Sequence, residues 1–132
     1  MANAIYPLFK AALIGGGANV DLSGGTVKAA LIDLDTYTYD AAHEFLDDIS
    51  GVVGTAVTLG TKTVTGGAFD SANPTWASVT GATVEAVILY VDTGTPSTSR
   101  LVLYLDTGQT DLPVTPNGGN IVYTVGSNWT QF

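Results

Sequence analysis

The sequence predicts a mainly β protein, a single-domain antiparallel β-sandwich or barrel-like fold with about two short helices. Short segments rich in Val, Ile, Leu, Thr and Tyr recur along the 132 residues, and turn signals separate them roughly every ten residues. This length fits one domain, and no linker, repeat or low-complexity tract divides the chain. We expect an N-terminal arm or short helix over residues 1–17 and one β-rich domain over residues 18–132.

Two segments have the spacing of a short helix. The first helix is expected in the segment from Ile5 to Leu13, where apolar residues share one face and three glycines follow. The second is expected from Ala41 to about Asp48, because Asp40 is a favourable N-cap and apolar residues again share a face. The first segment is equally well interpreted as a mobile arm that docks on a neighbouring subunit.

The rest of the chain has the pattern of β-strands. Residues 26–34 are almost continuously apolar, as in a strand that is covered on both faces. Gly66-Gly67 is a signal for a two-residue hairpin. Further strands are predicted within residues 55–59, 61–65, 68–70, 75–79, 83–91, 100–106 and 121–125.

Composition excludes several classes of partner. The net charge is −8 with only four basic residues, too few to neutralise the phosphates of DNA or RNA, and the same deficit disfavours anionic membranes. No run reaches the ~18 apolar residues of a membrane span. Six of the twelve acidic residues lie between Lys28 and Lys62, where no basic residue occurs. They indicate either a solvated face or a surface that docks on a basic partner.

Catalytic signatures are absent from the sequence. The single histidine, His43, has no nucleophile-elbow sequence to accompany it. The acidic pairs Asp33/Asp35 and Asp47/Asp48 are close neighbours in the sequence. Such neighbours do not supply two carboxyl groups facing each other across a cleft, as a glycosidase needs. Residues 33–48 offer many oxygen ligands for calcium, but they contain no EF-hand loop, and the chain has no cysteine. We therefore expect no enzymatic activity, no cofactor and no metal, and a role in binding other proteins.

A resemblance supports this expectation. The chain resembles a family of small virion structural proteins of tailed bacteriophages, over nearly its whole length. The stretches that carry the resemblance are Tyr6-Pro7-Leu8-Phe9-Lys10, residues 26–33, the block from Tyr37 to Ile49, Lys62-Thr63-Val64-Thr65 with Phe69-Asp70, Ala86-Val87-Ile88-Leu89-Tyr90 before Asp92-Thr93-Gly94, Ser99-Arg100-Leu101, and Pro116-Asn117-Gly118-Gly119.

The resemblance implies a place in the virion and no catalytic site. We expect a capsid decoration (cement) protein that binds across major capsid subunits on the capsid surface, made in the host cytoplasm and oligomeric within the virion. The alternatives are a neck, tail or baseplate subunit, and a glycan- or receptor-binding module of the virion. Residues expected to bind partners are Tyr6, Leu8 and Phe9 in the arm, Phe45 and Asp48 in the second helix, and an exposed aromatic patch of Tyr37 and Tyr39.

Overall fold

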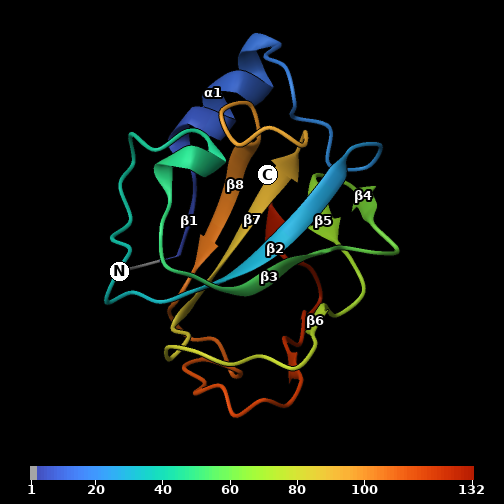
Figure 1. Ribbon diagram of the computed structural model, residues 1–132. Coiled ribbons are helices and arrows are strands. Elements are labelled where there is room, and N and C mark those ends of the chain that lie inside the picture. The colour runs from blue at the N-terminus through green and yellow to red at the C-terminus, as the bar shows by residue number, and fades with distance from the viewer. Residues whose placement is uncertain (1–2) are drawn as a thin grey trace.

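The computed structural model describes residues 3–132 and confirms the mainly β fold (Figure 1). Three antiparallel sheets contain all the strands of the described residues, and one short α-helix and one 3-10 turn accompany them. The largest sheet has the order β1 (Ala4–Ile5), β8 (Arg100–Leu105), β7 (Ala86–Asp92), β2 (Thr26–Ile32) and β3 (Val52–Thr58). The smaller sheets are β10 (Thr130–Gln131), β5 (Ala68–Asp70), β4 (Thr63–Thr65), and the pair β6 (Thr75–Trp76), β9 (Ile121–Val122).

The predicted central strands form the middle of the large sheet. β2 pairs with β7 over its whole length, from Thr26 opposite Asp92 to Ile32 opposite Ala86. Every residue of β8 is buried, and every residue of β7 except Asp92. Such strands are apolar on both faces because both faces are covered. In Figure 1, β5 and the red strand β10 lie behind β2, whereas the chain segment after β2 runs up the left side of the picture, outside β1 and β8.

The predicted hairpin at Gly66-Gly67 is confirmed. It joins β4 to β5, with Thr65 opposite Ala68 and both glycines at positive φ. A two-residue turn of this kind requires positive φ at both positions, which glycine adopts without strain.

The indole of Trp76, in β6, donates a hydrogen bond from Nε1 to the backbone oxygen of Ala29, 3.2 Å away. This bond fastens the two-stranded sheet to β2.

The first predicted helix is present as α1 (Pro7–Gly15). Pro7 is at its first turn, and Gly16 ends it in the left-handed conformation. The preceding residues form β1, a strand that the sequence pattern did not predict, and it pairs with β8 at the edge of the large sheet. The described part of segment 1–17 is therefore joined to the sheet rather than extended away from it.

The second predicted helix is wrong. Only a 3-10 turn, η1 (Leu46–Asp48), forms within residues 41–48. Asp40 does act as a local acceptor, but for a turn: its Oδ1 accepts from the N–H of Ala42 at 2.8 Å. The backbone of the next residues bonds to distant strands instead of to itself, since Leu101 donates its N–H to the oxygen of Glu44 at 2.9 Å. Tertiary hydrogen bonds thus override the helical spacing.

The edge strand β3 contains a bulge. Val57 lies opposite Ala29 and Val53 opposite Leu31, so three residues of β3 face the single residue Ala30 of β2. Gly54 lies in this bulge with a φ of 70°. The bulge turns the backbone of β3 out of the regular ladder at the open edge of the large sheet.

Candidate protein-binding surface

The residues expected to bind partners through the arm are mostly core residues. Tyr6 and Phe9 are fully buried, and the ring of Phe9 packs 5.7 Å from the ring of Phe132 near the end of the chain. Leu8 is half-buried. Truncating Tyr6 or Phe9 would therefore open the core, and neither side chain presents a surface to a partner.

The expected exposed patch of Tyr37 and Tyr39 is also wrong. Tyr37 is 2% exposed, and its hydroxyl lies 2.9 Å from the hydroxyl of Tyr6 and 2.7 Å from Nδ1 of His43. Tyr39 is half-buried, with its ring 5.3 Å from that of Tyr6 and 5.1 Å from that of Tyr104. Burial raises the pKa of both Tyr6 and Tyr37. Together the four tyrosines and His43 fasten residues 37–43 to the sheet.

Phe45 and Asp48 stabilise residues 44–48, which continue directly from residues 37–43. The guanidinium carbon of Arg100 lies 5.0 Å above the centre of the Phe45 ring, and its Nη1 pairs with Oε1 of Glu44 at 2.8 Å. Asp48 is exposed, and its carboxylate accepts hydrogen bonds from the N–H groups of Phe45 and Glu44. These two bonds lower the pKa of Asp48. Its charge remains accessible to solvent beside η1.

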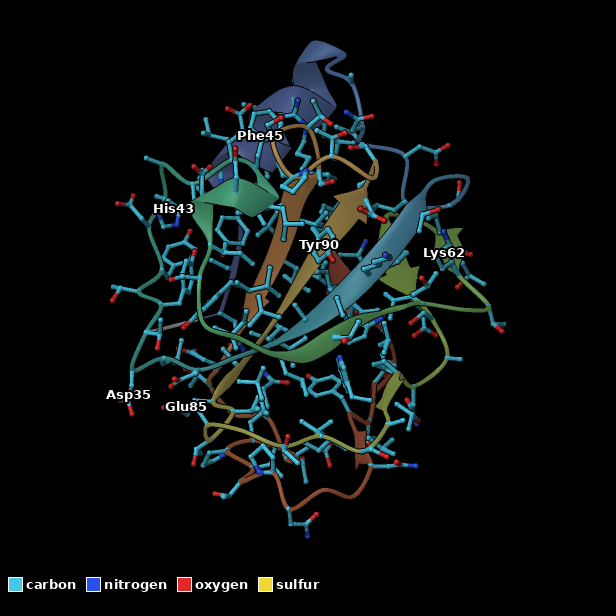
Figure 2. All side chains as sticks on the ribbon, viewed as in Figure 1. Asp35, His43, Phe45, Lys62, Glu85 and Tyr90 are labelled. Carbon is cyan, nitrogen blue, oxygen red and sulfur yellow. The ribbon has the colours of Figure 1, made fainter. Side chains whose placement is uncertain are left out.

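Within residues 3–132, the candidate sites for chemistry are one histidine and one carboxylate cluster. His43 is held by Tyr37, as described above, and no serine or acid forms a triad with it among the described residues. Asp33, Asp35 and Glu85 each place a carboxylate oxygen within 4.8 Å of the others, and Figure 2 shows Asp35 and Glu85 at the same corner of the molecule. Asp33 already accepts bonds from Asp35 N and Thr36 Oγ1. This corner is the place in the described chain where an oxygen-liganded cation would fit.

One apolar surface lies beside the free edge of β4, and we call it the β4 edge. Val64 is 52% exposed and lies opposite Phe69, whose backbone oxygen accepts from Trp129 on the other side. Ladder bonds alternate in direction along an antiparallel strand. The N–H and C=O of Val64 therefore point outward, away from β5. Beside them lies a pocket of about 310 Å³ lined by Leu13, Val20, Asp21, Leu22, Ser23, Val64, Gly67, Phe69 and Phe132.

A second apolar hollow, the sheet groove, lies on the face of the large sheet that carries Tyr90 (Figure 2). It has a volume of about 450 Å³. The side chains of η1 and the residues next to it form one wall, and the bulged part of β3 forms the other. Its lining is Lys28, Ala30, Leu46, Ile49, Val52, Gly54, Thr55, Ala56, Tyr90 and Pro96.

The helix α1 presents a third surface, the helix face, made of Lys10, Leu13 and Ile14. Leu13 is 41% exposed and Ile14 is 88% exposed. Sequence reasoning missed both Ile14 and Val64 as surface residues. The signal for Ile14 was present, because it falls outside the stripe formed by the apolar residues of the predicted helix. The exposure of Val64 depends on which strand ends the sheet, and no local pattern specifies that order.

Comparison with known proteins gives no relative to guide the assignment. No protein-family model matches the chain, and no curated protein sequence is significantly similar to it. Within residues 3–132, no helix combines the length and apolar character needed to cross a bilayer.

Proposed function

We propose that this chain is a non-enzymatic structural protein of a tailed-phage particle, and that it decorates the outside of the head by binding across major capsid subunits. The resemblance to small virion structural proteins supports a place in the particle. The proposed site of contact is the β4 edge. It combines unpaired backbone groups with an apolar pocket, which are the two elements needed to bind an extended segment of another protein as an added strand.

The free edge of β4 is the observation that carries the proposal. Natural proteins normally limit recruitment at an edge strand by a short length, a charge, a bulge or a covering segment. β4 is short, but its three residues pair in regular register, carry no charge and are all exposed, whereas β3 has a bulge. Val64 then places an apolar side chain at the centre of that edge.

The copy number in purified particles tests the location. Quantitative mass spectrometry would measure the ratio of this chain to the major capsid protein. We expect one copy for every one to three capsid subunits. A ratio of a few per hundred would contradict decoration, and would instead match a ring of the neck, tail or baseplate.

The variant Val64→Asp tests the surface. A buried charge without a partner is strongly unfavourable in an interface, so the variant should lose binding to particles that lack the protein. The matched control is Val122→Asp. Val122 is 45% exposed, close to the 52% of Val64, but it lies in β9 of the two-stranded sheet.

Both variants should remain folded, because neither side chain is buried in the monomer. Equal loss of binding in both variants would show that the binding does not depend on the β4 edge. Full binding by Val64→Asp would exclude this edge directly.

A further inference from the structure

We propose that copies of this chain bind one another head to tail, with the helix face of one copy in the sheet groove of the next. The two surfaces are different, so the contact is heterologous, and a contact of that kind closes into a ring or continues as a filament. The inference rests on the surface chemistry of this chain alone. It does not depend on the backbone edge at Val64 or on a particular place in a virion, and the one residue it shares with the β4 edge is Leu13, which also borders the pocket there.

The helix face is an apolar projection with a positive charge. Lys10 and Ile14 are four residues apart on α1 and share one side of the helix, and Leu13 flanks Lys10 on its other side. Ile14 is 88% exposed, and a side chain built on either Gly15 or Gly16 would meet no atom within 4 Å. The end of the helix therefore stands clear of the rest of the chain. Lys10 is exposed and makes no ion pair with any residue in 3–132.

The sheet groove offers the complementary surface. Its floor contains the small residue Ala30 beside Tyr90, and its β3 wall contains Gly54, which leaves room for an inserted aliphatic side chain. Lys28 at one end does not oppose a positively charged partner, because Nζ of Lys28 is paired with Oδ2 of Asp92 at 3.0 Å. The lining is thus apolar, with its one cation neutralised.

The charge beside the groove has the sign that the helix face requires. Asp47 and Asp48 are both exposed on η1. Leu46, which begins η1, and Ile49, which follows it, form one wall of the groove. The carboxylate of Asp48 is held at the start of η1, whereas that of Asp47 makes no ion pair among the described residues. When Ile14 of one copy occupies the groove of the next, Lys10 of the first copy brings its positive charge to the acidic rim formed by Asp47 and Asp48.

Charge also argues against the symmetrical alternative. A contact in which two helix faces meet would bring two Lys10 ammonium groups together and would leave both acidic rims exposed. The head-to-tail contact pairs opposite charges at every junction, which matters for a chain whose net charge of −8 otherwise drives copies apart.

Analytical ultracentrifugation of the purified full chain tests the inference, with two single variants. Ile14→Asp places an acid on the helix face, and Thr55→Asp places an acid in the groove, where the exposed Thr55 lines the bulged wall. The wild-type chain should form assemblies larger than a dimer as its concentration rises. Each variant alone should associate at least about tenfold more weakly, as expected from the loss of one buried aliphatic contact.

Mixing the two variants separates a head-to-tail contact from any other. Ile14→Asp keeps an intact groove and Thr55→Asp keeps an intact helix face, so an equimolar mixture should form a one-to-one dimer. It should form nothing larger, because the remaining two surfaces each carry an acid and repel. A symmetrical contact would not be restored by mixing, and that result would overturn the proposal. A wild-type chain that stays monomeric up to about 1 mM would also overturn it.

The variant Val64→Asp makes the failures of the two proposals distinguishable. It should assemble with itself like the wild type, because Val64 belongs to neither surface, while it fails to bind particles. Loss of self-assembly in Val64→Asp would show that copies meet through the β4 edge, and the head-to-tail contact would then be wrong.

Discussion

Removing one hydroxyl group, in the variant Tyr37→Phe, should destabilise the protein markedly. The phenol oxygen of Tyr37 lies 2.9 Å from that of Tyr6 and 2.7 Å from Nδ1 of His43. Tyr6 is fully buried, and no other hydrogen bond of its hydroxyl occurs among the described residues, so its loss of a partner costs roughly 1–3 kcal/mol. His43 is half-buried and can bond to water instead, so the loss of its bond to Tyr37 adds only about 0.5 kcal/mol to the destabilisation.

The expected loss is therefore about 1.5–3.5 kcal/mol, a large share of the ~5–15 kcal/mol that stabilises a typical domain. Urea unfolding followed by tryptophan fluorescence measures it, since Trp76 and Trp129 are both buried in the folded state. For a chain of this length the same loss should lower the melting temperature by roughly 5–13 °C.

Two further variants test the physical reason. Tyr39→Phe is the matched control, because the Tyr39 ring packs in the same cluster while its hydroxyl makes no hydrogen bond within residues 3–132; we expect a change below about 0.5 kcal/mol. The double variant Tyr6→Phe/Tyr37→Phe leaves no buried hydroxyl unpaired, so it should be no less stable than Tyr37→Phe. The reasoning is refuted if Tyr37→Phe is as stable as Tyr39→Phe.

Two other predictions concern the hairpin and the η1 turn. Gly67→Ala should cost roughly 1–2 kcal/mol and Gly66→Ala about 1 kcal/mol: both have positive φ, but only at Gly67 would a Cβ lie 3.0 Å from the backbone oxygen of Phe132, in addition to displacing the side chain of Gln131. Thermal unfolding of the two variants should therefore differ, and equal melting temperatures would contradict the expected clash. Asp48→Ala should cost at most about 1 kcal/mol at pH 7, after allowance for solvent screening. Because folding lowers the pKa of Asp48, this contribution is present above the unfolded pKa of ~3.9 and disappears as the pH falls through the lower folded value. Denaturation curves of the variant and the wild type should approach each other as the pH falls below ~3.9, and a constant difference would show that the carboxylate charge is not involved.

The strands were predictable from the sequence wherever burial alone determines the pattern. β2 and β8 are covered on both faces, and a continuous apolar run records that directly. The hairpin was predictable because only glycine suits two consecutive positive φ angles. β1 and β10 have only two residues each, and they form strands because each pairs with a strand that is far away in the sequence. No pattern of two residues can reveal such a partner.

The candidate site was less predictable, for a similar reason. Tyr37 lies among polar residues in the sequence, which is typical of an exposed position, but Tyr6 and His43 satisfy its hydroxyl in the interior. The predicted second helix failed where Leu46 donates its N–H to the oxygen of Ser99 instead of to its own segment. Both errors arise from contacts between residues far apart in the chain, which periodicity does not report.

The bulge in β3 has a consequence for how concentrated this protein can become. β3 has seven residues and no charged side chain, and a straight edge of that kind would recruit other copies into ladders in proportion to the square of their concentration. The backbone turn at Gly54 interrupts the edge after two residues, so that any misaligned pairing ends almost where it begins. Indiscriminate ladder growth through this edge is therefore suppressed, so that any association between copies depends on the specific shape and charge of other surfaces rather than on backbone pairing along β3.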